Sequence, residues 1–187
     1  MPSRKTFLRT MGVMGSMFSV PEAFANMKND DAALTPLLSN RNKENSYWYI
    51  GHLMSLLVTS KETGNKYALL RATERKGLEP PPHIHTKEDE AFLILEGEVV
   101  YTVGSKTFNA KQGDLMFLPK NIPHSFKIQS EKLETLILLT PGGLENYFVE
   151  MSKPAEELAL PPLPQGPPDL KKLIATASKY GVTFPKM

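Results

Sequence analysis

Two histidines and a glutamate lie close together in the middle of the chain. His83 and His85 are two residues apart, and Glu90 follows five residues later. Prolines at positions 80–82 keep the preceding backbone extended, and residues two apart on an extended segment point to the same face. Imidazoles combined with a carboxylate suit a divalent first-row transition metal better than calcium or magnesium, which prefer all-oxygen ligands. This stretch therefore predicts one side of a metal site.

A third imidazole follows in a second stretch. Gly113 indicates a turn, residues 115–118 a short apolar strand, and a proline-bounded loop then leads to His124. Three imidazoles and one carboxylate leave one or two positions open on a five- or six-coordinate metal, as a catalytic metal requires. The alternative is an ordinary hydrogen-bonding role for these histidines. The predicted metal ligands are His83, His85, Glu90 and His124.

These stretches resemble the two motifs of the cupin superfamily over about residues 45–155. The constrained family positions are matched by Gly77, His83, His85, Glu90, Gly97, Gly113, Pro119 and His124. Asn121 replaces a family glycine and can adopt the same positive φ, whereas Ile128 replaces a frequent asparagine and leaves the ligands unchanged. The resemblance implies one bound divalent transition metal, which would be Mn, Fe, Co, Ni, Cu or Zn. It also implies that Glu90 is both a ligand and a catalytic base.

Short apolar segments alternate with turns along most of the chain. Strands are expected over residues 47–50, 52–58, 67–72, 91–95, 99–103, 107–109, 115–118, 124–128 and 133–140. This spacing is typical of an antiparallel β-barrel or jelly roll and agrees with the family resemblance. The predicted fold is therefore all-β, a single cupin jelly-roll barrel with a short helix after it (144–152) and a C-terminal helix (169–180).

Strand alternation predicts which side chains share the interior with the metal. The predicted substrate pocket comprises Met54, Phe92, Ile94, Phe126 and Phe148. Plain core packing remains the alternative for Met54, Phe92 and Phe126. His52 lies on the same strand face as Met54, and we interpret it as a packed or surface histidine rather than a ligand.

The pattern divides the chain into four parts: a signal peptide (1–25), an arm or linker (26–45), the barrel with its short helix (46–152), and a Pro-rich connector with the C-terminal helix (153–187). The first part resembles a twin-arginine signal with Lys5 in place of the second arginine, so the general secretion route stays open. A disordered or membrane-surface amphipathic N-terminus is the other interpretation. The apolar run within residues 1–25 is too short to span a bilayer, so no stable membrane anchor is expected after cleavage of the signal peptide. We expect a periplasmic or secreted protein.

Composition limits the partners. The 187 residues are sufficient for one domain with appendages, and the absence of cysteine excludes disulfides and thiolate ligands. The signal segment accounts for the formal net charge of +2, so the remaining chain is near neutral and nucleic acid is not an expected partner. A small-molecule substrate is expected, and a homodimer to which residues 26–45 contribute stays open.

The region after the barrel resembles that of single-domain, quercetin 2,3-dioxygenase-like cupins, through Tyr147-Phe148 in a short helix and the closing residues 179–184. This resemblance implies a dioxygenase that cleaves a hydroxylated aromatic, flavonol-like substrate with O₂. Two alternatives remain, an isomerase, epimerase or lyase acting on a sugar or small acid, and a non-enzymatic binding protein. The aromatic and aliphatic pocket favours the dioxygenase.

Overall fold

The structure is a computed structural model that describes residues 34–166 and 168–185. The predicted signal peptide lies outside these residues, as does the first part of the predicted arm. In chain order the elements are β1 (Ser46–Tyr49), β2 (His52–Val58), α2 (Ser60–Thr63), β3 (Ala68–Arg75), β4 (Ile84–His85), β5 (Asp89–Glu96), β6 (Glu98–Val103), β7 (Lys106–Lys111), β8 (Leu115–Leu118), β9 (His124–Ile128), β10 (Lys132–Thr140), α3 (Glu145–Met151), β11 (Lys153–Pro154), α4 (Leu170–Lys179) and β12 (Val182–Thr183).

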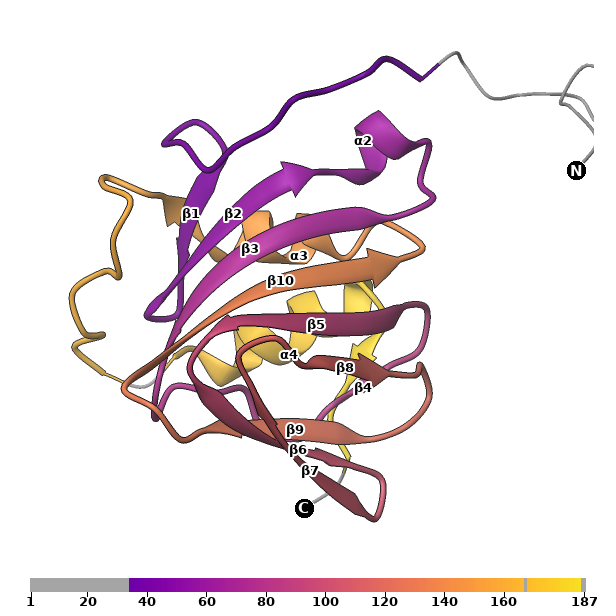
Figure 1. Ribbon diagram of the computed structural model, residues 1–187, viewed down its shortest axis with the longest axis vertical. Helices are drawn as coiled ribbons and strands as arrows, with labels where there is room; N and C mark the ends of the chain where they lie inside the picture. The colour runs from indigo at the N-terminus through magenta and orange to yellow at the C-terminus, as the bar shows by residue number, and fades with distance from the viewer. Residues whose placement is uncertain (1–33, 167, 186–187) are drawn as a thin grey trace, which may run out of the picture. The chain divides into compact units, whose positions relative to one another are not determined.

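Two antiparallel sheets form the body of the described chain. The larger has the strand order β11-β1-β2-β3-β10-β5-β8, and the smaller has the order β7-β6-β9. Strand β10 lies between β3 and β5, so strands distant in sequence become neighbours (Figure 1). This crossing is the feature that distinguishes a jelly roll from a meander. The prediction of an all-β jelly roll followed by two helices is confirmed.

The core lies on the inner faces of the sheets because side chains alternate along each strand. On β3 the inward row includes Leu70, on β5 it includes Phe92 and Ile94, and on β10 it includes Ile137 and Leu139. All five side chains are buried in one cluster. Burial of each contributes roughly 1.5–3 kcal/mol relative to exposure. This continuous apolar layer holds the strands that carry the predicted ligands.

The described part of the predicted arm packs on the opposite, outer face of the larger sheet. The Arg41 guanidinium donates hydrogen bonds to Ser55 Oγ (3.1 Å) and Thr73 Oγ1 (3.0 Å). It also forms an ion pair with Glu134 Oε1 at 3.1 Å. These contacts attach residue 41 to β2, β3 and β10 at once.

The C-terminal segment adds a strand that the sequence did not predict. Strand β12 pairs with β4, placing Val182 opposite His85. The Thr86 amide donates to the Gly181 carbonyl at 2.9 Å, and Gly181, with φ +86°, turns the chain from α4 into this strand. Helix α4 packs on α3, which contacts β1. Within the described residues, no helix is long and apolar enough to cross a membrane.

Candidate metal centre

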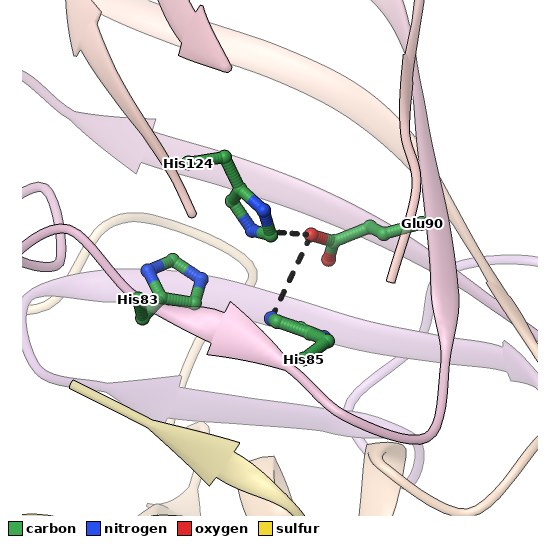
Figure 2. A group of neighbouring side chains, drawn as sticks. All are labelled: His83, His85, Glu90 and His124. Atoms are coloured by element: carbon green, nitrogen blue, oxygen red, sulfur yellow. Dashed lines mark ion pairs between the residues drawn. The ribbon is translucent and has the colours of Figure 1, made fainter. Parts of the chain in front are cut away.

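The structure brings the four predicted ligands together. His83, His85, Glu90 and His124 are all buried, and each offers a ligand atom within 4.8 Å of the others. Glu90 Oε2 lies 3.9 Å from His85 Nε2 and 3.7 Å from His124 Nε2. Figure 2 shows the three imidazoles grouped opposite the Glu90 carboxylate, whose oxygen is joined by dashed lines to His85 and His124. This arrangement could hold one metal ion.

Backbone pairing explains why two separate stretches of sequence meet here. The His83 amide donates to the His124 carbonyl at 3.0 Å, and the His124 amide donates back to His83 at 2.9 Å. His83 and His85 share one face of the extended segment, with ring centroids 5.0 Å apart. The backbone amide of Asn121 donates a hydrogen bond to the His85 carbonyl at 2.8 Å, and Asn121 has φ +64°. The expectation that this asparagine takes the left-handed conformation of the family glycine is confirmed.

The hydrogen bonds of the imidazoles fit a metal at the centre. His83 Nδ1 lies 2.9 Å from the Pro81 carbonyl, and His124 Nδ1 lies 3.1 Å from the Ile122 carbonyl. Because a carbonyl only accepts, each Nδ1 must carry the proton, which leaves an Nε2 lone pair for a metal. His124 Nε2 is buried and has no hydrogen-bond partner. A buried acceptor without a partner is the expected state of a ligand atom.

Burial sets the protonation of the site. It lowers the pKa of His85 to about 3 and of His124 to about 4, and the neighbouring imidazoles act in the same direction. It also lowers the pKa of His83. Burial, with the nearby Glu74 and Glu88 carboxylates, raises the pKa of Glu90 to about 8. The imidazoles are therefore neutral, the form that binds metal, and a metal ion competes with a proton mainly at Glu90.

The ligands form part of the wall of a cavity of about 280 Å³. Met54, Phe92, Phe126 and Phe148 line it, as the sequence predicted. Ile94, which was also predicted for the substrate pocket, is not among the residues that line this cavity. Ile94 faces inward like Phe92, but it lies one strand repeat further from Glu90, where the core is filled and its side chain is only 1% exposed.

His52 also lines the cavity, but both its ring nitrogens are occupied. Its Nδ1 accepts from the Arg75 amide at 3.0 Å, so its Nε2 carries the proton that is donated to the Leu78 carbonyl at 2.9 Å. This agrees with its interpretation as a packed histidine.

Sequence reasoning missed other residues of the cavity wall. Tyr49 and Tyr147 line it with their hydroxyl oxygens 2.9 Å apart, and Glu74 lines it from β3. Phe184, beyond β12, lies with its ring centroid 6.5 Å from that of His83. Of these four residues, only Glu74 had a signal in the sequence, because it is a glutamate in the otherwise apolar inward row of β3. The other three are brought to the cavity by long-range packing.

Comparison with known proteins agrees with this geometry. Residues 71–140 match the family model described as "Cupin domain". A quercetin 2,3-dioxygenase of Bacillus subtilis is 21% identical over 127 residues, covering 68% of this chain and 38% of the relative. One of Aspergillus japonicus is 30% identical over 103 residues, covering 51% of this chain and 29% of the relative. The chain thus spans well under half the length of these enzymes.

Solved structures show the same fold at low identity. KdgF from Halomonas sp. has a TM-score of 0.52 and 14% identity, covering 60% of this chain and 99% of that one. A "predicted oxalate decarboxylase" from Thermotoga maritima has a TM-score of 0.51 and 24% identity, covering 56% and 99%. Residues 71–140 are therefore similar in sequence to the cupin domain, and the described chain has the jelly-roll fold of cupins.

Proposed function

We propose that this protein is a metal-dependent dioxygenase that cleaves a hydroxylated aromatic, flavonol-like compound with O₂. One observation carries the proposal: a buried three-histidine, one-glutamate cluster opens into an aromatic cavity whose described lining contains no lysine or arginine. The two relatives named quercetin 2,3-dioxygenase support it. A divalent ion held by these residues would supply Lewis-acid activation of a substrate hydroxyl and a redox-active centre for dioxygen.

The cavity wall favours an aromatic ring over a sugar or small acid. Phe92, Phe126 and Phe148 present ring surfaces, and the polar tips of Tyr49 and Tyr147 are occupied by each other. A site for a sugar or carboxylate needs cationic, amide or hydroxyl groups that orient the ligand. Apart from the tyrosines, the described lining residues carry no side-chain hydroxyl or amide. The apolar wall would also exclude water from the reacting ring.

Glu90 is the proposed proton acceptor of the reaction. Its carboxylate faces the imidazoles of His85 and His124, and its raised pKa suits a group that takes a phenolic proton, although a bound cation acts in the opposite direction. The imidazoles stay neutral because their pKa values are lowered. The substrate ring is oxidised and both oxygen atoms enter the product, so no external reductant is required.

The first experiment is elemental analysis of the protein purified without chelator or affinity metal, followed by oxygen-uptake assays. We expect about one equivalent of a first-row metal, and oxygen uptake with flavonols and simpler phenols but not with sugars or small acids. Absence of metal even after reconstitution would overturn the proposal. Metal without oxygen uptake, but with isomerisation or elimination of a sugar or acid, would assign another reaction class.

The role of Glu90 is tested by Glu90→Gln. Loss of a ligand and a base should weaken metal affinity about 10–100-fold and reduce turnover by at least about 100-fold. Glu96→Gln is the matched control, since Glu96 is an exposed carboxylate on the same strand and pairs with Lys132. If Glu90→Gln retains both metal and turnover, the assigned role is wrong.

We also propose that the protein acts in the periplasm or outside the cell, because residues 1–25 have the pattern of an export signal. The mass of the protein recovered from cell fractions tests this. A species beginning at Asn26 in the exported fraction supports the proposal, and an unprocessed chain found only in the cytoplasm contradicts it.

A further inference from the structure

Glu74 is a carboxyl group in an apolar position. On β3 it follows Leu70 and Ala72 in the inward row, and those two side chains are completely buried. Glu74 is itself only 6% exposed, and it lines the cavity. Burying such a group is unfavourable unless hydrogen bonds compensate. The hydrogen bonds and ion pairs of Glu74 therefore show whether contacts within the protein compensate for its burial.

The protein leaves much of the Glu74 hydrogen-bonding capacity unused. Its one hydrogen bond among the described residues comes from Thr135 Oγ1 to Oε2 at 3.4 Å, which is long. No lysine, arginine or histidine of the described chain forms an ion pair with it. The neighbouring Glu79 carboxylate raises the pKa of Glu74, and Glu74 in turn raises the pKa of Glu90.

A second glutamate of the same cavity provides an internal contrast. Glu79 Oε1 accepts from the Ile128 amide at 2.9 Å, and its Oε2 accepts from the Gly77 amide at 3.0 Å. Both its oxygens therefore have partners that belong to the fold. Of the two carboxyl groups that line the cavity outside the ligand set, Glu74 is therefore the one that no backbone amide of the described residues holds in place.

We propose that Glu74 is a substrate-recognition residue, whose carboxyl group hydrogen-bonds a hydroxyl of the bound aromatic compound and selects hydroxylated over unsubstituted rings. This inference rests on the proposed function for the class of substrate. Small-molecule sites commonly combine an apolar lining with a few placed polar groups that fix orientation. A site built to bond a hydroxyl disfavours the analogue without it, because the buried polar group is then left unpaired.

Protonation supports this role. Burial raises the pKa of Glu74 to about 8, and the Glu79 carboxylate acts in the same direction. At neutral pH the group therefore retains its proton and can both donate to and accept from a hydroxyl.

The test measures binding in the zinc-loaded full chain, where turnover is suppressed because zinc is not redox-active. The probes are quercetin, which carries hydroxyls, and flavone, the same skeleton without them. Glu74→Met removes the carboxyl at similar length, and Glu74→Gln keeps hydrogen-bonding capacity. We expect Glu74→Met to weaken quercetin binding at least about tenfold without weakening flavone binding, and Glu74→Gln to stay within about threefold of wild type.

Unchanged quercetin affinity in Glu74→Met, or an equal loss for both probes, would overturn the inference. The dioxygenase proposal would survive that result if the wild type still consumed oxygen. Failure of the zinc-loaded wild type to bind quercetin would overturn both. If Glu74→Met does not fold, infrared difference spectra of wild type with and without quercetin decide the question. A shifted carboxylic C=O band that Glu74→Gln lacks supports the role, and no shift overturns it.

Discussion

The ligand side of the cavity is built by strands β4, β5 and β9, whereas the closing side is built by α3, α4 and β12 near the C-terminus. On the ligand side, backbone pairing joins two short motifs directly through His83 and His124. On the closing side, Tyr147, Phe148 and Phe184 reach the cavity only because helices and a short strand fold back over it. Metal binding is thus encoded locally and pocket shape over long range, so substitutions on the two sides should affect different measurements.

The largest effect is expected on the ligand side, from His83→Ala/His85→Ala. Two of four ligand atoms are lost, so metal content should fall from about one equivalent to below about 0.1. Elemental analysis measures this. His52→Asn is the control, since His52 lines the same cavity with both ring nitrogens bonded to the backbone, and it should keep its metal. Equal metal in the double variant and wild type would contradict the assigned ligand set.

The matching change on the closing side is Phe184→Ala. Removal of this half-buried ring beside His83 should leave metal content unchanged but open the cavity to water. We expect stability to fall by about 1–2 kcal/mol, less than for a fully buried ring, and KM for a phenolic substrate to rise several-fold. Ile174→Ala, at an exposed position of α4, is the control. If Phe184→Ala loses metal in proportion to activity, the two sides are not separable.

The same contrast explains what could be predicted from the sequence. His83, His85 and Glu90 were identifiable because they lie close together after a proline run, and His124 because a proline-bounded loop leads to it. The longer strands of the barrel were identifiable from apolar segments and the turns between them, and the inward direction of Phe92 from alternation along β5.

Alternation specifies the face of a strand but not the position along it, so the sequence could not show that Ile94 is packed in the core while Phe92 lines the cavity. The pairing of β12 with β4 joins segments about a hundred residues apart, and neither two-residue strand has a sequence pattern that predicts it. The Tyr49 and Tyr147 contact depends in the same way on how α3 packs against β1. Glu74 was visible in the sequence, but its lack of partners could be seen only in three dimensions.

A smaller effect should appear in the pH dependence of metal-free stability. Glu74 and Glu90 have folded-state pKa values raised to about 8, so the folded protein holds protons that the unfolded chain releases. Their contribution to the free energy of unfolding is fully present below the pKa that they have in the unfolded chain, and it is lost as the pH rises through 8. The lowered pKa values of His85 and His124 act oppositely, adding stability as pH rises from about 4 to 6.5.

Chelator-treated protein should therefore be most stable near pH 6 and lose about 1 kcal/mol or more by pH 9, as measured by thermal or urea unfolding. Glu74→Gln should show a smaller decline, because one of the two carboxyls is removed. A wild-type curve that keeps rising above pH 7 would mean that the two carboxyls are ionised in the folded state.

The smallest effect is expected from Asn121→Gly, which, compared with Asn121→Val, tests how local the ligand side is. Its φ of +64° carries a modest strain that glycine would relieve, but glycine also increases the entropy of the unfolded chain. These terms nearly cancel, so Asn121→Gly should change the free energy of unfolding by less than about 0.5 kcal/mol.

Asn121→Val should lower the free energy of unfolding by about 1–3 kcal/mol, because a β-branched residue disfavours this conformation. Since the Asn121 amide holds the His85 carbonyl, the valine variant should also bind metal more weakly, whereas Phe184→Ala should not. Unfolding curves and metal titrations of the three variants compare these effects, and full metal affinity in a destabilised Asn121→Val would show that this loop does not position His85.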